Sequence, residues 1–204
     1  MSGKEDILIV CALEQETQDQ LDDWDILYTG VGKVNATHWM TEYLCSEKMV
    51  GEIPKLVINY GTAGSRELPV GELVDCTKFI QRDMDCTGFG ILKGQTPFED
   101  TDYLYNGRSI IVLDSNSEFN PIGKHYTCGT GDNFVDNIED EIEYVDVFDM
   151  EAYALAKVCN YYYVPFISFK YITDNANEHS TVDWEDNLGK GIIDFKEKIL
   201  EKIK

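Results

Sequence analysis

Short apolar runs recur along the chain and alternate with polar, glycine-rich or helical segments. The runs at residues 7–12 and 55–60 are apolar almost throughout, which is typical of strands that are buried on both faces of a sheet. In chain order, strands are predicted over residues 7–12, 24–29, 55–60, 71–80, 108–113, 124–128, 145–148 and 166–172.

Three further segments carry apolar residues at helical spacing. The first follows Gly30-Val-Gly-Lys-Val34, the second follows Glu151, and the third covers residues 188–203. Residues 81–107 are mostly polar and show no period, so they are predicted to form loops. The pattern as a whole indicates a strand-rich α/β protein.

Most of the predicted strands end at an acid or at a glycine turn. Asp174 follows the strand at 166–172, and Glu16 lies in a polar, helix-favouring segment just after the first strand. Ligands of open α/β sheets bind beyond the carboxyl ends of strands, so both acids are candidates for chemistry. An acid at such a point equally suits a turn or the first turn of a helix. The glycine turns at 30–32, 61–64 and 129–131 fit a small-molecule site, but none has the spacing of a P-loop.

Composition narrows the classes of protein that the chain can represent. With 204 residues and 43% hydrophobic content, residues 1–204 can form one domain with a substantial core. A formal net charge of -21 argues against nucleic acid and anionic membranes as partners. The chain has no apolar run of about 20 residues and no signal-peptide pattern, so a cytoplasmic protein is expected.

The metal-binding residue types are scattered. Six cysteines contain no CxxC pair and lie mostly in apolar runs, which predicts reduced, buried thiols. The histidines, at positions 38, 125 and 179, lack ligand spacing. No metal and no other cofactor is therefore expected.

Eight short segments, in order and nearly from end to end, match one superfamily. They are Ala12-Leu-Glu-Gln-Glu16, Gly30-Val-Gly-Lys-Val34, Asn59-Tyr-Gly-Thr-Ala-Gly64, Val70-Gly-Glu-Leu73, Asp83-Met-Asp-Cys-Thr87, Gly131-Asp-Asn-Phe134, Asp149-Met-Glu151 and Ile172-Thr-Asp174. The chain resembles the purine nucleoside phosphorylases and nucleosidases, and most of all the 5′-methylthioadenosine/S-adenosylhomocysteine nucleosidases. The resemblance implies a single-domain, three-layer, nucleoside-phosphorylase-like α/β fold, in which helices flank a central mixed twisted sheet.

The resemblance also implies a reaction, the hydrolysis of the N-glycosidic bond of adenine nucleosides with an apolar 5′-thio substituent. Asp174 matches the acid that protonates N7 of the purine, which turns a poor anionic leaving group into a neutral one. Glu16 matches the glutamate that activates water, and Glu151 matches the carboxylate that accepts hydrogen bonds from the ribose hydroxyls. Met150 would pack under the sugar.

The remaining matches concern the base and its surroundings. Phe134 matches the aromatic residue that stacks on the base, and the backbone of Val135 matches the group that reads the purine edge. Thr62 and Thr173 stand where the family has small hydroxyl residues, and Lys170 stands where it typically has arginine.

The wall around the 5′ substituent is also implied by the resemblance. Leu13, Val31 and Trp184 match wall positions of the same chain, and Cys86 and Phe89 match positions contributed by the partner subunit of a homodimer. Such apolar side chains suit a thioether better than a phosphate. Ordinary core packing would explain each of them as well.

The chain is a trimmed version of the family pattern. Glu16 and Gly30 are only 14 positions apart, and the segment from 134 to 150 is also short. The trimming leaves the preference for the 5′ group open.

Three alternatives to this function remain at the level of sequence. Phosphorolysis would need arginines around the phosphate, and the chain has only Arg66, Arg82 and Arg108, with none in the Glu16 loop. Another purine nucleoside, such as inosine or a menaquinone-pathway nucleoside, could be the substrate. A catalytically idle acidic binding protein or DNA mimic would have the same bulk charge.

Overall fold

The computed structural model describes residues 3–98, 104–105, 108–109, 111–112, 119–136 and 145–203. Its main sheet contains β1 (Ile7–Cys11), β2 (Asp25–Tyr28), β3 (Leu56–Gly64), β4 (Leu73–Gln81), β7 (Ile111–Val112), β8 (Tyr126–Thr130), β9 (Val147–Asp149) and β10 (Phe166–Asp174). A separate two-stranded sheet pairs β5 (Leu104–Tyr105) with β6 (Arg108–Ser109).

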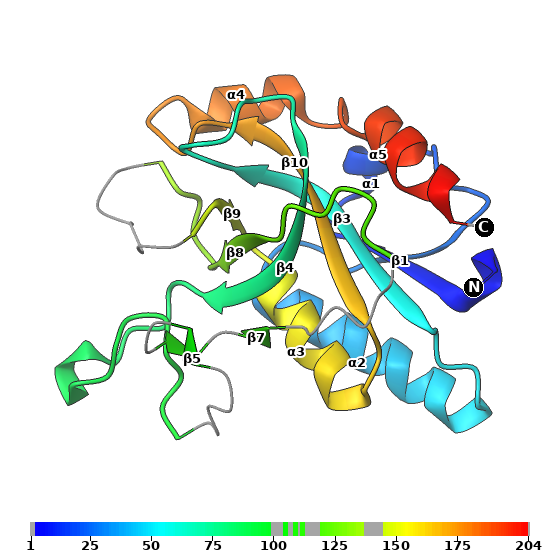
Figure 1. Cartoon of the computed structure of the whole chain (residues 1–204), viewed down its shortest axis with the longest axis horizontal. Coiled ribbons are helices and arrows are strands. Elements are labelled where there is room, and N and C mark those ends of the chain that lie inside the picture. Colours follow the sequence, from blue (N-terminus) through cyan, green and yellow to red (C-terminus); the bar gives the residue numbers. More distant parts are fainter. Residues whose placement is uncertain are drawn as a thin grey trace.

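The helices are α1 (Glu14–Thr17), α2 (Lys33–Val50), α3 (Ala152–Tyr162), α4 (Ser180–Asn187) and α5 (Ile192–Lys198), with short 3₁₀ turns at Lys4–Asp6, Thr87–Phe89 and Leu200–Lys202. Figure 1 shows α2 and α3 on one side of the sheet and α4 and α5 on the other. The predicted arrangement of a central mixed sheet with flanking helices is confirmed.

The main sheet is mixed, and part of it closes on itself. β3 pairs in parallel with β1 and β10, and β10 pairs antiparallel with β4. β4, β8 and β9 then follow in parallel, and β9 returns to β3 through the antiparallel pair of Gly64 and Phe148. Five strands therefore form a ring, from which β1 and β2 extend as an open wing.

The side chains of β1 explain why its sequence is apolar at every position. Leu8 and Val10 belong to the core cluster that contains Met40 of α2. Ile9, between them, belongs to the cluster on the opposite face, which contains Phe195 of α5. Because successive strand residues point to opposite faces, a strand with helices on both sides must be apolar throughout.

Several boundaries differ from the predicted ones, and the strand predicted over 108–113 is wrong as one element, because 108–109 is β6 of the two-stranded sheet and 111–112 is β7 of the main sheet. The glycine turns predicted at 61–64 and 129–131 are wrong in part, because β3 continues to Gly64 and β8 to Thr130. The final amphipathic helix is shorter than predicted, since it begins at Ile192, and α4 forms a separate helix before it that the sequence pattern does not predict. Residues 139–143 form an acidic run whose simplest interpretation from the sequence is a solvated face, and they lie outside the described residues.

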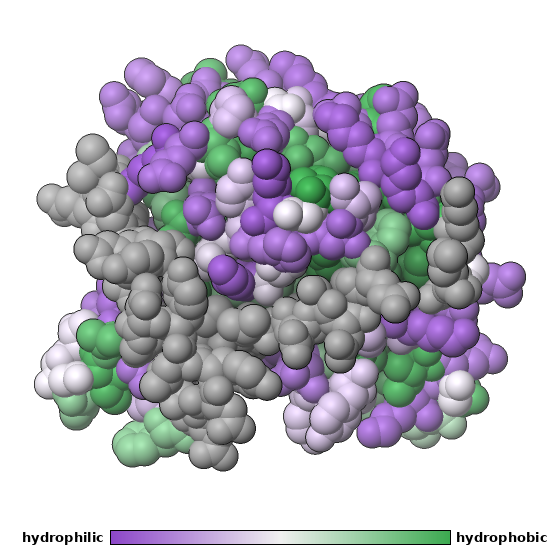
Figure 2. Space-filling model, in the orientation of Figure 1, coloured by the Kyte–Doolittle hydropathy of each residue, from purple (hydrophilic) through white to green (hydrophobic). Residues whose placement is uncertain are grey.

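The surface, the cysteines and the helices bear on the expectations drawn from composition. Figure 2 shows a face on which hydrophilic residues predominate, as expected for so acidic a chain. Four of the six thiols are buried, but Cys45 is exposed and Cys86 is half-buried, so the prediction of buried thiols is wrong for Cys45. In the described part of the chain, no helix combines the length and the apolar character that a membrane span requires.

Two methionines of α2 provide a matched test of the core. Met40 is fully buried, whereas Met49 is 84% exposed. We expect Met40→Ala to lower the free energy of unfolding by about 2–5 kcal/mol through the cavity it leaves. Met49→Ala should change it by less than about 0.5 kcal/mol. Urea unfolding would measure both, and equal effects would contradict this assignment of the core.

Candidate active site

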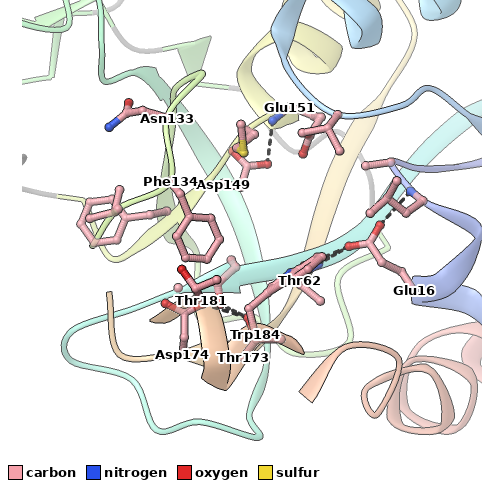
Figure 3. Close-up of a pocket in the computed structure, with 18 of the residues that line it drawn as sticks. Glu16, Thr62, Asn133, Phe134, Asp149, Glu151, Thr173, Asp174, Thr181 and Trp184 are labelled. Carbon is pink, nitrogen blue, oxygen red and sulfur yellow. Dashed lines mark hydrogen bonds between the residues drawn. The ribbon is translucent and has the colours of Figure 1, made fainter. Parts of the chain in front are cut away.

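Three carboxylates from distant parts of the chain converge on one cavity. Glu16 comes from α1, Glu151 immediately precedes α3, and Asp174 ends β10. Figure 3 shows them around a common open space. The cavity has a volume of about 380 Å³ and is lined by Ala12, Leu13, Glu16, Val31, Thr62, Ala63, Gly64, Arg82, Asn133, Phe134, Val135, Phe148, Asp149, Met150, Glu151, Thr173, Asp174, Thr181 and Trp184.

The carboxyl group of Glu16 is buried, with a relative exposure of 3% for the residue. Its Oε2 accepts a hydrogen bond from the backbone N–H of Leu13 at 3.1 Å. Its Oε1 accepts two from Thr62, from the backbone N–H at 2.8 Å and from the hydroxyl at 3.0 Å. Glu16 is therefore fixed at the cavity wall, and the alternative of a solvated helix start is wrong.

Asp174 is held just as firmly at the other end of the site. Its Oδ2 accepts a hydrogen bond from the hydroxyl of Thr173 at 3.0 Å, and its Oδ1 accepts one from the backbone N–H of Ala176 at 3.0 Å. A Cβ atom added to Gly64 would lie 2.6 Å from Oδ1. The glycine therefore gives the acid its space.

Glu151 connects the start of α3 to the glycine loop before α2. Its Oε1 accepts a hydrogen bond from the backbone N–H of Gly32 at 2.8 Å. Burial, followed by the nearby negative charge of Asp149, raises the pKa of Glu151 to about 8. The carboxyl group is therefore poised to change its charge near neutral pH.

An ion pair lies directly behind this wall. The ammonium group of Lys170 is 2.8 Å from Oδ2 of Asp149, and both side chains are almost completely buried. Asp149 also accepts hydrogen bonds from the hydroxyl of Thr130 at 2.6 Å and from the backbone N–H of Ala152 at 2.8 Å. Burial alone would raise the pKa of Asp149, but the charge of Lys170 and the hydrogen bonds from Lys170, Thr130 and Ala152 together outweigh burial and lower that pKa.

All the site residues predicted from the sequence line the cavity, apart from Cys86 and Phe89. Phe134 is 39% exposed at the cavity, next to the buried Val135. Phe89 is 87% exposed and Cys86 is half-buried, both outside this cavity. Their role in a partner's pocket stays a prediction.

The sequence did not single out Arg82, Asn133 or Asp149 as site residues. Arg82 is buried at the cavity and donates hydrogen bonds to both the side chain and the backbone carbonyl of Asn133. Asp149 follows a predicted strand and precedes a predicted helix, which is the signal by which Asp174 and Glu16 were found. Arg82 also follows a predicted strand, but nothing else in the polar loop that it begins indicates a site residue.

Comparison with known proteins agrees with this geometry. Residues 26–202 match the phosphorylase superfamily. The chain is 31% identical over 185 residues to a 5′-methylthioadenosine/S-adenosylhomocysteine nucleosidase of Anoxybacillus flavithermus, an alignment that covers 85% of this chain and 77% of the relative. The chain therefore belongs to the phosphorylase superfamily. Within that superfamily it belongs to the family of 5′-methylthioadenosine/S-adenosylhomocysteine nucleosidases.

Solved structures show the same fold. A nucleosidase of this family from Helicobacter pylori, a mutant with 5′-methylthioadenosine in its active site, has a TM-score of 0.75 at 21% identity, covering 92% of this chain and 93% of that one. A mutant futalosine hydrolase of Helicobacter pylori has a TM-score of 0.79 at 20% identity, covering 96% and 98%.

The buried ion pair gives a prediction about stability. Lys170→Met leaves the charge of Asp149 buried without its partner, and we expect it to lower the free energy of unfolding by about 3–5 kcal/mol at neutral pH. The double variant Lys170→Met/Asp149→Asn should recover part of this loss. Lys198→Met, which breaks the exposed pair with Asp194, should cost less than about 1 kcal/mol.

The pH dependence of this effect has a definite sign. Because the pKa of Asp149 is lowered in the folded protein, the pair stabilises it above the ordinary value of 3.8, and the stabilisation is lost as pH falls through the lowered value. The difference between wild type and Lys170→Met should therefore shrink in acid. Urea unfolding at several pH values would test this, and a difference independent of pH would contradict it.

Proposed function

We propose that this chain hydrolyses the N-glycosidic bond of adenine nucleosides with an apolar 5′-thio substituent, such as 5′-methylthioadenosine and S-adenosylhomocysteine. The products would be adenine and the thio-ribose. The observation that carries the proposal is the convergence of three buried carboxylates, Glu16, Glu151 and Asp174, on one cavity with an aromatic wall. Membership of the nucleosidase family supports the same reaction.

In this proposal Asp174 is the general acid. Its proton goes to N7 of the purine while the bond between C1′ and N9 breaks, so that the base leaves as a neutral molecule. The side chain lies at the cavity and is only 2% exposed, and its two hydrogen bonds hold its direction. Phe134 would stack on the base, and the backbone of Val135 would read its edge.

Glu16 and Glu151 act on the ribosyl side of the bond. The ribosyl group becomes electron-poor at C1′ as the base departs, and nearby carboxylates stabilise it. Glu16 takes the proton of the attacking water. Glu151 accepts hydrogen bonds from the ribose 2′ and 3′ hydroxyls, and Met150 packs under the sugar.

The charges of the cavity favour water over phosphate as the acceptor. The ionisable residues that line it, among those the structure describes, are four acids, namely Glu16, Asp149, Glu151 and Asp174, and one base, Arg82. Arg82 is bonded to the Asn133 loop, and Lys170 is paired with Asp149. A phosphate dianion next to Glu16 would therefore meet repulsion from that acid.

The apolar 5′ pocket completes the proposal. Leu13, Val31 and Trp184 form its wall in this chain, and Thr62 and Thr173 support the neighbouring acids. We infer that Cys86 and Phe89 close it from the partner subunit of a homodimer. Support comes from the segment around Phe89, which exposes Phe89, Leu92 and Phe98.

The free thiols agree with a reducing, cytoplasmic setting.

The reaction is tested by incubating the protein with 5′-methylthioadenosine, S-adenosylhomocysteine, 5′-deoxyadenosine, adenosine and inosine, with and without phosphate. Free adenine and an unphosphorylated sugar are expected from the thio-nucleosides in both buffers. Asp174→Asn should lower kcat by at least about 10²-fold while the substrate still binds, because only the proton donor is lost. Asp186→Asn, at an exposed position of α4, is the matched control. A sugar phosphate as the main product would contradict hydrolysis.

The raised pKa of Glu151 predicts the pH profile. In the free protein this group is mostly protonated below about pH 8, and its ionised form accepts hydrogen bonds from the ribose more strongly. We therefore expect kcat/KM to rise with pH up to about 8, since this ratio reports the free enzyme. Glu151→Gln should lower kcat/KM and remove this limb. An unchanged profile in the variant would show that another group titrates.

A further inference from the structure

Helix α4 donates a hydrogen bond to the residue that holds Glu16. The indole N–H of Trp184 donates to Oγ1 of Thr62 at 3.0 Å, and this hydroxyl is 3.0 Å from Oε1 of Glu16. Figure 3 shows Trp184, Thr62 and Glu16 joined at the wall of the cavity. The three residues lie 46 and 122 positions apart along the chain, so only the fold brings them together.

The chemistry of the three groups fixes the direction of every proton. An indole N–H can only donate, so the hydroxyl of Thr62 must accept from Trp184 with a lone pair. A hydroxyl has one proton, and the carboxylate of Glu16 is the acceptor within reach of it. Trp184 therefore orients the hydroxyl, and polarisation along such a chain strengthens the second hydrogen bond.

A count of the lone-pair sites distinguishes the two oxygens of Glu16. A carboxylate has about four lone-pair sites, two on each oxygen. Oε1 already accepts from both the N–H and the hydroxyl of Thr62, so both of its sites are occupied. Among the residues that the structure describes, Oε2 accepts a hydrogen bond only from the N–H of Leu13, which leaves one site for a further donor.

We propose that Trp184 is a positioning residue which, through Thr62, makes Oε2 the oxygen of Glu16 that receives the proton of the attacking water. The inference rests on the proposed function. In the balanced step, the water oxygen bonds to C1′, its proton goes to Oε2, the bond to N9 breaks with its electrons on the base, and Asp174 gives its proton to N7.

Without the indole N–H, the hydroxyl of Thr62 can rotate away from Glu16. Oε1 then regains an open site and competes with Oε2 for the water, so fewer bound substrates have the water in line with C1′. The loss falls on the chemical step, because Trp184→Phe keeps an aromatic side chain in the wall.

A double-mutant cycle tests the proposal, with Trp184→Phe, Thr62→Val and their combination as variants and 5′-methylthioadenosine as the substrate. Trp184→Phe should lower kcat by about tenfold and change KM by less than about threefold. The combination should be no slower than Thr62→Val alone, because the indole acts only through the hydroxyl. Thr62→Ser, which keeps the hydroxyl, should retain most of kcat. Trp39→Phe, at an exposed position of α2 away from the cavity, is the control.

Three outcomes would overturn the inference. In the first, Trp184→Phe changes KM but not kcat. In the second, kcat of the combined variant falls by the product of the two single losses. In the third, Trp184→Phe keeps full activity. These outcomes are distinct from failure of the proposed function, which would appear as a wild-type protein that releases no base from any nucleoside. Thermal unfolding of each variant would check that it is folded, so that the kinetic constants compare folded proteins.

Discussion

The buried ion pair between Lys170 and Asp149 is the interaction on which the arrangement of the site depends. Two charges are removed from water here, at a cost of several kcal/mol for each, and their attraction offsets it only because Asp149 also accepts hydrogen bonds from Thr130 and Ala152. These contacts join β8, β10 and the start of α3. The position of Glu151, at the start of that helix, follows from them.

Glycine makes room for the carboxylates that this pair helps to arrange. A Cβ atom on Gly61 would lie 3.2 Å from Oε1 of Glu16 and 3.3 Å from the ammonium group of Lys170. Gly64 stands in the same relation to Asp174. Both glycines lie within β3, so their function is to let side chains from α1 and β10 approach the backbone, and not to turn the chain. Read from the sequence alone, they resembled a turn.

The sequence predicted the strands and most of the site because local signals marked both. Continuous apolar runs predicted buried strands, and acids at strand ends pointed to Glu16 and Asp174, which line the same cavity. Closure of the five-strand ring, the burial of Arg82 and the hydrogen bond of Trp184 depend on contacts between distant residues. No local pattern encodes such contacts. Helix α4 was missed because its eight residues are mostly polar and lack a clear apolar stripe.

The closed ring also bears on how the protein avoids aggregation. A ring has no free edge, whereas the wing ends at β2, which pairs only with β1 among the described strands. Unpaired edges are templates for adding strands from other molecules. Here the edge is only four residues long, and Asp22, Asp23 and Asp25 lie exposed at its start. Repulsion between these acids on two copies would discourage edge-to-edge stacking into fibrils.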